Sequence, residues 1–564
     1  MKKSQVFREY FILFLVIGLS ILLAGAQFVE KNKVSDALKN EINQTGSLMK
    51  SGLAPENPEF VEYQKNKLLT QKGPSLDGHK RGLIPSPVDL HHLSRISQAG
   101  GSAPAHYDLR TLNKVTTVKD QGYAGSCWAF AAYGALESDL MSGKNRDFSE
   151  NNLKNLLSNT HAEGFDFDEG GNRLMSTAYL TRWSGPVAES DDPYSDSSSY
   201  SPTGLPVRKH VQYVYYLSSR KGPLDNQEIK STVQNYGAID TSLYYDDSCY
   251  SPITHSYYFD GSSDSNHEVA IVGWNDSYNK NNFSRIPPGN GAFIVKNSWG
   301  TGWGENGYFY VSYYDSNIGS EGTIYKAENP DNYKYIYQYD PLGLSSCYGY
   351  DNSPTAWCAN IFTARYSNEV LKAVGFYTTD VNSRYEIYIY TNPGLKPAGQ
   401  ANPVLTQKGT ISNAGYHTVH LNSGVKLKAG QKFSVVLKLT TPNYDYPVPI
   451  EYPVEGYSSK ATAHAGESFV SPDGKNWIDL TKDPDCQNTN VCIKAFTDLG
   501  TALPVANFSA TPTSGYAPLT VSFADTSTGG TPTSWYWDLE MAQIQIKLER
   551  PRTHLPGWEY IPLP

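Results

Sequence analysis

The sequence predicts an α+β domain followed by an all-β sandwich, and three observations support this fold class. Small and apolar residues recur at spacings of three or four between Ala129 and Leu140, which is one face of an amphipathic helix. Two apolar, strand-like runs follow far downstream, one beginning at His267 and one ending at Asn297. From residue 335 to 498, strand-like runs alternate with Pro/Gly turns and show no helical period.

Composition narrows the class of protein further. The chain has 564 residues, of which 39% are hydrophobic and 18% charged, and this is typical of a globular protein with two to four domains. Its net charge is −9 and it has no Lys/Arg-rich run, which argues against nucleic acid as a partner. The 42 tyrosines, 47 glycines and 34 prolines suit β-rich, turn-rich extracellular modules.

The N-terminal residues 1–26 have the pattern of a secretory signal peptide. A basic start is followed by an apolar stretch and by the small residues Ala24-Gly25-Ala26, where a signal peptidase would cleave. If this segment is retained, it serves as a membrane anchor, and only then is a membrane a partner. In either case we expect the protein to be secreted or held at the cell surface. Residues 27–102 are polar and mixed in charge, and their simplest interpretation is a linker.

Cys127 follows the glycine-rich turn "QGYAGS" and opens the predicted helix. Unpaired backbone N–H groups and the helix dipole favour an anion in the first turn of a helix. A thiol at this position is therefore biased toward the reactive thiolate. A lone cysteine is more often a small buried hydrophobe, so the assignment depends on its partners in the rest of the chain.

The partners are His267, 140 residues downstream, and Asn297, 170 residues downstream. With the segments "AHYDLRTLNKVTTVKDQG", "FSENNLKNLL", "EGGNRLMSTAYL" and "VKNSWGTGWGENGYF", they give residues 103–330 a resemblance to the papain-like cysteine peptidases. The resemblance implies a two-lobed fold with a helical lobe and a β lobe. It also changes the interpretation of residues 27–102 to a pro-segment, although the helical motif of papain pro-segments is not visible there.

The resemblance also implies a role for each site residue. Cys127 is the expected nucleophile, His267 its base and acid, and Asn297 the group that orients the imidazole. The Gln121 side chain and the Cys127 backbone N–H are expected to form the oxyanion hole. The remaining site residues are the expected substrate-binding residues Gly170, Gly171 and Trp299, the last of which would shield the His–Asn contact.

Three departures from the family pattern are visible. The usual cysteine three residues before the nucleophile is Ala124 here, so the disulfide that it forms in relatives is absent. The 30-residue gap between His267 and Asn297 is longer than in papain, and its polar excess predicts a surface hairpin. Glu268 follows the histidine directly, and we expect its side chain to point away from the ring.

Residues 335–498 resemble the lectin-like domain that follows the peptidase in some prokaryotic, especially archaeal, members of the family. Cell-surface glycans are possible ligands of this domain, while a scaffold role is the favoured alternative. In an oxidising compartment its four cysteines suggest two local disulfides, Cys347–Cys358 and Cys486–Cys492, and leave Cys249 free or paired between molecules.

Residues 503–538 resemble part of a PKD-like β module of surface proteins, with three expected short strands. Such modules continue from Trp-Asp into Phe-Gly-Asp-Gly, whereas Leu539-Glu-Met-Ala follows here, so residues 539–564 form an aberrant tail. Deletion of one base would convert the first sequence into the second, which suggests a frameshift. About 35 residues of a sandwich are too few to close a core.

These observations predict a secreted or cell-surface cysteine endopeptidase that acts on proteins or peptides, with no cofactor and no metal site. Two alternatives stay open at this point. One is a surface adhesion or glycan-binding protein whose peptidase domain is vestigial. The other is a thiol acyltransferase or transpeptidase that uses the same acyl-enzyme.

Overall fold

A computed structural model describes residues 51–66, 78–93, 103–141, 146–158, 167–351, 353–399, 402–500, 505–514, 520–528 and 559–562. The predicted signal peptide or anchor, residues 1–26, lies outside these residues, as does most of the tail. No helix within the described ranges has the length and apolar character needed to cross a membrane.

The helical lobe is built around α3 (Cys127–Leu140), which begins at the nucleophile candidate as its spacing predicts. All but the last two residues of α3 are buried, so it is a core helix rather than a surface one. Two shorter helices pack beside it, α4 (Glu150–Leu156) and α5 (Arg173–Thr181). Ser149 and Asn172 cap these helices by accepting hydrogen bonds from backbone N–H groups of their first turns.

The β lobe consists of mostly antiparallel strands packed against α6 (Gln227–Tyr236), with one parallel pair, β6 and β9. Its strands are β2 (His106–Asp108), β4 (Ile239–Leu243), β5 (Tyr250–Ser251), β6 (Ser256–Tyr257), β7 (His267–Asn275), β8 (Ala292–Lys296) and β9 (Tyr308–Ser312). β7 pairs with β4 on one side and with β8 on the other. The turn between β7 and β8 carries the long polar insertion, so the predicted surface hairpin is confirmed.

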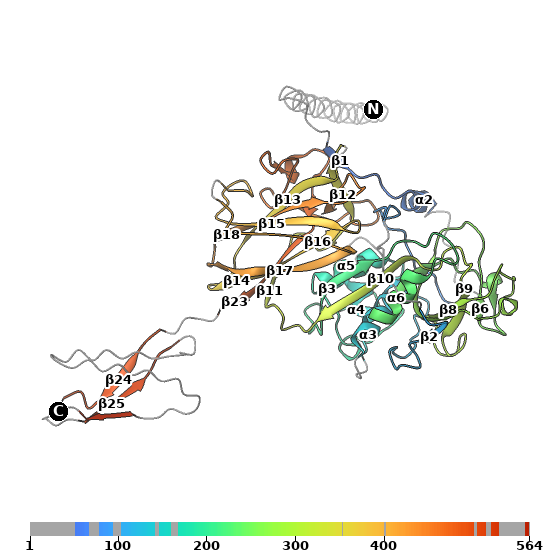
Figure 1. Cartoon of the computed structure of the whole chain (residues 1–564), viewed down its shortest axis with the longest axis horizontal. Helices are drawn as coiled ribbons and strands as arrows, with labels where there is room; N and C mark the ends of the chain where they lie inside the picture. The colour runs from blue at the N-terminus through green and yellow to red at the C-terminus, as the bar shows by residue number, and fades with distance from the viewer. Residues whose placement is uncertain are drawn as a thin grey trace, which may run out of the picture.

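Two further strands, β3 (His210–Tyr216) and β10 (Ser320–Glu328), connect the β lobe to the all-β domain. In the sheet, β10 pairs with β4 and with β3, and β3 pairs with β17 (Ala414–Leu427) of the all-β domain. One thirteen-stranded sheet therefore runs from the peptidase through the β domain (Figure 1). The sequence predicted the two domains but not the continuous sheet between them.

The all-β domain is a sandwich, as predicted. One layer has the order β16–β15–β18–β13–β20–β21, and the end of the long sheet, β11–β23–β14–β17, supplies further strands around the same core. The bounds are β11 (Tyr335–Tyr337), β13 (Thr355–Thr363), β14 (Glu369–Thr378), β15 (Ser383–Thr391), β16 (Leu405–Ile411), β18 (Lys432–Thr440), β20 (Ser468–Ser471), β21 (Ile478–Asp479) and β23 (Ile493–Leu499). A small sheet of β1 (Ser51–Leu53), β12 (Ser346–Tyr350), β19 (Val448–Glu451) and β22 (Asn490–Val491) completes the domain.

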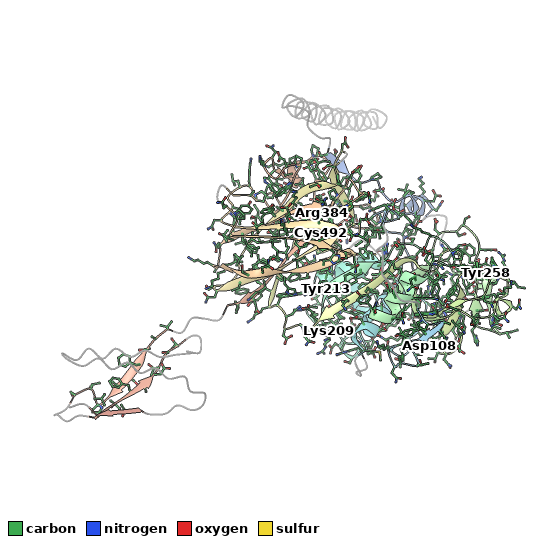
Figure 2. The ribbon with its side chains drawn as sticks, in the orientation of Figure 1. Asp108, Lys209, Tyr213, Tyr258, Arg384 and Cys492 are labelled. Atoms are coloured by element: carbon green, nitrogen blue, oxygen red, sulfur yellow. The ribbon has the colours of Figure 1, made fainter. Side chains whose placement is uncertain are left out.

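The two predicted disulfides, Cys347–Cys358 and Cys486–Cys492, are wrong: all six cysteines of the chain are free and buried. The members of each predicted pair pack into different cores. Cys347 and Cys492 face the core shared with the helical lobe, whereas Cys358 and Cys486 face the sandwich core. Figure 2 shows Cys492 inside the β domain. Nearness in sequence did not bring these side chains into the same core.

The C-terminal region contributes β24 (Phe508–Thr511) and β25 (Thr520–Asp525), which pair antiparallel. A third strand, β26 (Glu559–Pro562), comes from the predicted aberrant tail and pairs with β25. The assignment to a PKD-like module stays a prediction.

The junction between β17 and β3 gives a test of the continuous sheet. Gly415 has φ +128°, and a Cβ added there would lie 1.9 Å from the carbonyl oxygen of Val214 on β3. We expect Gly415→Ala to lower the free energy of unfolding by about 2 to 3 kcal/mol. Gly222→Ala is the control, because a Cβ there meets nothing within 4 Å. Equal melting temperatures for the two variants would contradict the close approach of the strands.

Candidate active site

Cys127 lies at the first position of α3 and is completely buried. Ser126 precedes the helix without capping it through its side chain, so the sulfur rather than a hydroxyl faces the first backbone N–H groups. The Glu268 N–H lies 3.4 Å from Sγ, and the N–H groups of Gly82 and Trp128 also donate to it. The helix of one lobe and the strand β7 of the other therefore meet at this sulfur.

His267 opens β7, and its Nε2 lies 2.9 Å from Oδ1 of Asn297, the residue after β8. The β7–β8 pairing fixes both residues, and both are buried. The Trp299 ring lies over the imidazole with a centroid separation of 4.8 Å, and it is itself 2% exposed. The structure thus brings together three of the predicted site residues, His267, Asn297 and Trp299.

Gln121 lies beside this group and is held by four hydrogen bonds. Its Oε1 accepts from Ser298 Oγ at 2.7 Å and from Trp299 Nε1 at 3.2 Å. Its Nε2 donates to the Ala124 carbonyl at 2.9 Å and to the Lys80 carbonyl at 2.8 Å. The Gln121 side-chain amide, which is expected to donate to the oxyanion, therefore already donates to the Lys80 carbonyl from the N-terminal part of the chain.

Residues 78–93, here called the cleft segment, run between the lobes over Cys127. Gly171 exchanges backbone hydrogen bonds with this segment, donating to the Gly82 carbonyl and accepting from the Ile84 N–H, each at 2.9 Å. On the other wall the Leu83 N–H donates to the Asn266 carbonyl at 3.2 Å. The predicted substrate-binding glycines thus bind extended backbone; Gly170, with φ +141°, lies against Ile84.

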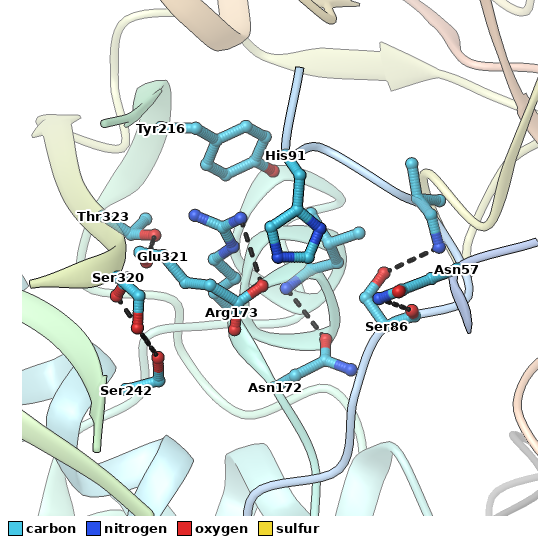
Figure 3. Close-up of polar contacts among 12 residues, drawn as sticks. Asn57, Ser86, His91, Asn172, Arg173, Tyr216, Ser242, Ser320, Glu321 and Thr323 are labelled. Atoms are coloured by element: carbon cyan, nitrogen blue, oxygen red, sulfur yellow. Dashed lines mark hydrogen bonds and ion pairs between the residues drawn. The ribbon is translucent and has the colours of Figure 1, made fainter. Parts of the chain in front are cut away.

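The cleft segment is anchored at its far end by the all-β domain. Residues 51–53 form β1, which pairs with β12, and His92 stacks on Tyr444 with ring centroids 4.0 Å apart. Between these anchors Asn57 donates to the Ser86 carbonyl at 2.9 Å, which ties the two described parts of residues 51–93 together (Figure 3). A short helix, α2 (Pro58–Asn66), lies in this region and was not predicted.

The covered cleft opposes the predicted bias of Cys127 toward the thiolate. Burial, with the nearby Glu268 carboxyl, raises the pKa of the thiol to about 12. A charged sulfur loses its hydration when Gly82 and the two lobes enclose it, and the three N–H donors offset only part of that cost. The sequence argument considered the helix terminus alone and did not include the chain segment that covers it.

Glu268 lies near two acids on the neighbouring strands, the buried Asp240 of β4 and the partly exposed Glu321 of β10. Its carboxyl interacts with Asp240 and Glu321, and burial raises its pKa well above the usual value. Burial likewise raises the pKa of Asp240 to about 7, although Tyr325 donates a hydrogen bond to it at 3.0 Å. Arg173 supplies positive charge here and contacts Glu321 at 3.3 Å (Figure 3).

A second buried ionic network lies behind Asn297, and sequence reasoning missed it. Lys119 Nζ contacts Glu150 at 2.8 Å and Glu137 at 3.9 Å, and Lys296 Nζ donates to Thr116 at 3.1 Å. A cavity of about 20 Å³, enough for one water molecule, separates these groups from Asn297 and Ser298. Burial lowers the pKa of Lys296 and raises that of Glu150 to about 8. The only sequence signal was the position of Lys296 immediately before Asn297.

The fold and the site together define a cysteine peptidase with a Cys–His–Asn group. A model of the papain family cysteine proteases matches residues 103–326, and a model of the lectin-like domain matches residues 336–497. The viral cathepsin of Lymantria dispar multicapsid nuclear polyhedrosis virus is 30% identical over 292 residues, which are 50% of this chain and 74% of the relative. The chain therefore belongs to the papain family of cysteine proteases.

Other relatives extend this result. Cathepsin K of Gallus gallus is 33% identical over 230 residues, which are 37% of this chain and 59% of that protein. The crystal structure of the cysteine protease and lectin-like domains of Cwp84, a surface layer associated protein of Clostridium difficile, is 25% identical with a TM-score of 0.68. It covers 80% of this chain and 99% of its own. Clostridial Cwp84 after propeptide cleavage is 27% identical with a TM-score of 0.62, and covers 70% of this chain and 99% of its own.

The fit of the cleft segment depends on a glycine. A Cβ added at Gly82 would lie 2.1 Å from the Gly125 carbonyl oxygen, a backbone atom that cannot move aside easily. We expect Gly82→Ala to lift the cleft segment and to increase the rate at which iodoacetamide alkylates Cys127 in the full-length chain by at least about tenfold. Peptide mass mapping identifies the alkylated cysteine. Gly52→Ala is the control, since a Cβ there meets nothing within 4 Å, and equal rates for the two variants would contradict the close approach.

The raised pKa of Asp240 gives a pH dependence with a defined sign. Between about pH 4 and pH 7 the folded protein keeps a proton that the unfolded chain has lost, so this group lowers the free energy of unfolding as pH rises. We expect Asp240→Asn to raise the melting temperature relative to the wild type progressively across this window, corresponding to about 2 to 4 kcal/mol. The exposed Asp331→Asn is the control. If the difference in melting temperature between Asp240→Asn and the wild type does not change with pH, the Asp240 carboxyl is not the source of the pH dependence.

Proposed function

We propose that the chain is the precursor of a secreted or cell-surface cysteine endopeptidase that hydrolyses peptide bonds in proteins. The observation that carries this proposal is the convergence of Cys127, His267, Asn297 and Gln121 on a cleft in which extended backbone already lies. The similar protein Cwp84 is surface layer associated, and this supports an extracellular location here.

The geometry supports a two-step acyl transfer. Because Nε2 of His267 is held by Asn297, Nδ1 is the ring nitrogen that exchanges a proton with the sulfur. The thiolate attacks the peptide carbonyl carbon, and the resulting oxyanion is stabilised by the Gln121 side chain and the Cys127 N–H. The imidazolium then protonates the leaving nitrogen, the C–N bond breaks, and a thioester remains on Cys127. Water, deprotonated by His267, hydrolyses the thioester and restores the enzyme.

Residues 27–102 act as an inhibitory pro-segment in this proposal. The Lys80 carbonyl occupies the Gln121 donor, Gly82 covers the sulfur, and Gly171 is engaged by backbone, so a substrate has no access to the same groups. Loss of this segment re-exposes Cys127 to water and to His267, which lowers the cost of the thiolate. The structure of Cwp84 after propeptide cleavage shows that a similar protein loses such a segment.

The lectin-like domain serves mainly as a scaffold for the cleft in this proposal, with glycan binding as a second candidate. Its strand β17 continues the peptidase sheet, and its Tyr457 donates to Asn172 Oδ1 at 3.1 Å, next to the substrate-binding glycines. These contacts support a structural role in positioning the helical lobe.

Active-site labelling tests the proposal. The protein, freed of residues 27–102, should bind the thiol-directed epoxide E-64 and degrade casein, and Cys127→Ala should abolish both. Gln121→Ala should retain labelling but lower kcat by about 10²- to 10³-fold, because it removes one oxyanion donor. Cys249→Ala is the matched control and should leave both readouts unchanged. A wild-type protein that neither binds E-64 nor degrades casein would favour the adhesion alternative.

A further inference from the structure

The three residues that precede Gly82 in the cleft segment are all basic, and each contacts an aspartate of the cleft wall. The pairs are His79 Nε2–Asp120 Oδ1 at 3.0 Å, Lys80 Nζ–Asp168 Oδ2 at 3.3 Å and Arg81 Nη2–Asp247 Oδ2 at 3.3 Å. Three consecutive basic residues thus meet three aspartates that come from distant parts of the sequence.

The three aspartates lie on different sides of the cleft. Asp120 precedes Gln121, Asp168 lies two residues before Gly170, and Asp247 lies in the short helical turn Asp247–Cys249 of the β lobe. Aromatic rings complete the surface between them. His79 stacks on Trp299 with centroids 5.4 Å apart, and the Arg81 guanidinium lies 5.6 Å from the Tyr245 ring centre. This half of the cleft is built to hold cations from several directions.

Chemistry identifies which half of a substrate would lie there. His267 has to protonate the leaving nitrogen, so the residues after the scissile bond lie on the side of its ring. The Trp299 ring lies 4.8 Å from that ring, and His79 stacks on Trp299. The Gly170–Gly171 wall, engaged by Gly82 and Ile84, then binds the residues before the scissile bond.

We infer that the mature enzyme prefers substrates with lysine or arginine within the first three positions after the scissile bond, and that Asp168 and Asp247 select them. This inference rests on the proposed peptidase function. When the pro-segment leaves, Lys80 and Arg81 leave with it, and the carboxylates of Asp168 and Asp247 remain beside the cleft. A basic substrate then makes the same kind of ion pairs that the pro-segment made.

The exposed fraction of each ion pair indicates how much its aspartate should contribute to the preference for basic substrates. The Arg81 and Asp247 side chains are 15% and 25% exposed, whereas Lys80 and Asp168 are 36% and 39% exposed. Exposed ion pairs contribute little and are screened by salt, so Asp247 should have the larger effect. Asp120 is less suited to mutation because it also accepts a hydrogen bond from the Gly122 N–H beside Gln121.

The experiment uses the mature enzyme and two quenched fluorescent peptides that differ only after the cleaved bond. One peptide has three arginines there, and the other has three glutamines. We expect the arginine peptide to show the higher kcat/KM by about tenfold at low salt, with the ratio falling at 0.5 M NaCl. Asp247→Asn should reduce the ratio about fivefold, Asp168→Asn about twofold, and the exposed Asp331→Asn not at all.

Two outcomes would overturn the inference while leaving the proposed function intact. One is equal cleavage of the two peptides by the wild type. The other is a kcat/KM ratio of the two peptides that neither Asp168→Asn nor Asp247→Asn changes, while both variants weaken inhibition by a synthetic peptide of residues 78–93. In that case the two aspartates would bind only the pro-segment and would not select substrates. Failure to cleave either peptide, or casein, would instead overturn the proposed function.

Discussion

The packing of α3 against β4, β7 and β10 is the constraint on which the site depends. Three backbone N–H groups donate to the Cys127 sulfur, but the position of the residue follows from the helix that carries it. The helix approaches the sheet closely because the facing residues are small: a Cβ added at Gly134 would lie 3.5 Å from the Ala270 side chain on β7. The same strand carries His267 three residues earlier, so the core packing that joins α3 to β7 also sets the distance between nucleophile and base.

A second constraint follows from covering this site with backbone. The Gln121 amide and Gly171 engage peptide groups of the cleft segment with the donors and acceptors that a substrate would use. These neutral hydrogen bonds cost little to exchange for water, whereas burial of the sulfur raises the pKa of the thiol. In the proposed precursor, latency therefore depends on two coupled effects, exclusion of substrate and suppression of the thiolate. A single departure, that of residues 78–93, relieves both.

The sequence placed the residues of the candidate site in local patterns but gave little information on their surroundings, for a physical reason. Cys127, His267 and Asn297 are each embedded in a local pattern, a helix start, a strand start or a strand end, that fixes their backbone. The disulfide prediction failed because it used sequence distance, whereas strand pairing sent Cys347 and Cys358 to different cores. The Lys119–Glu150 pair, the strand β1 and the β17–β3 junction all depend on contacts between distant segments, which no local pattern reports.

The continuous sheet changes how the lectin-like domain should be understood. A domain joined by a flexible linker would leave the peptidase unchanged, but β17 pairs directly with β3, and Tyr216 of β3 lies beneath Arg173 of α5 with 5.1 Å between guanidinium and ring. Arg173 in turn contacts Glu321 and adjoins Asn172, which caps α5 and accepts from Tyr457. The start of α5 and the adjacent Gly170–Gly171 wall are therefore held from both domains. Shape and rigidity of the substrate cleft are properties of the two domains together rather than of the peptidase alone.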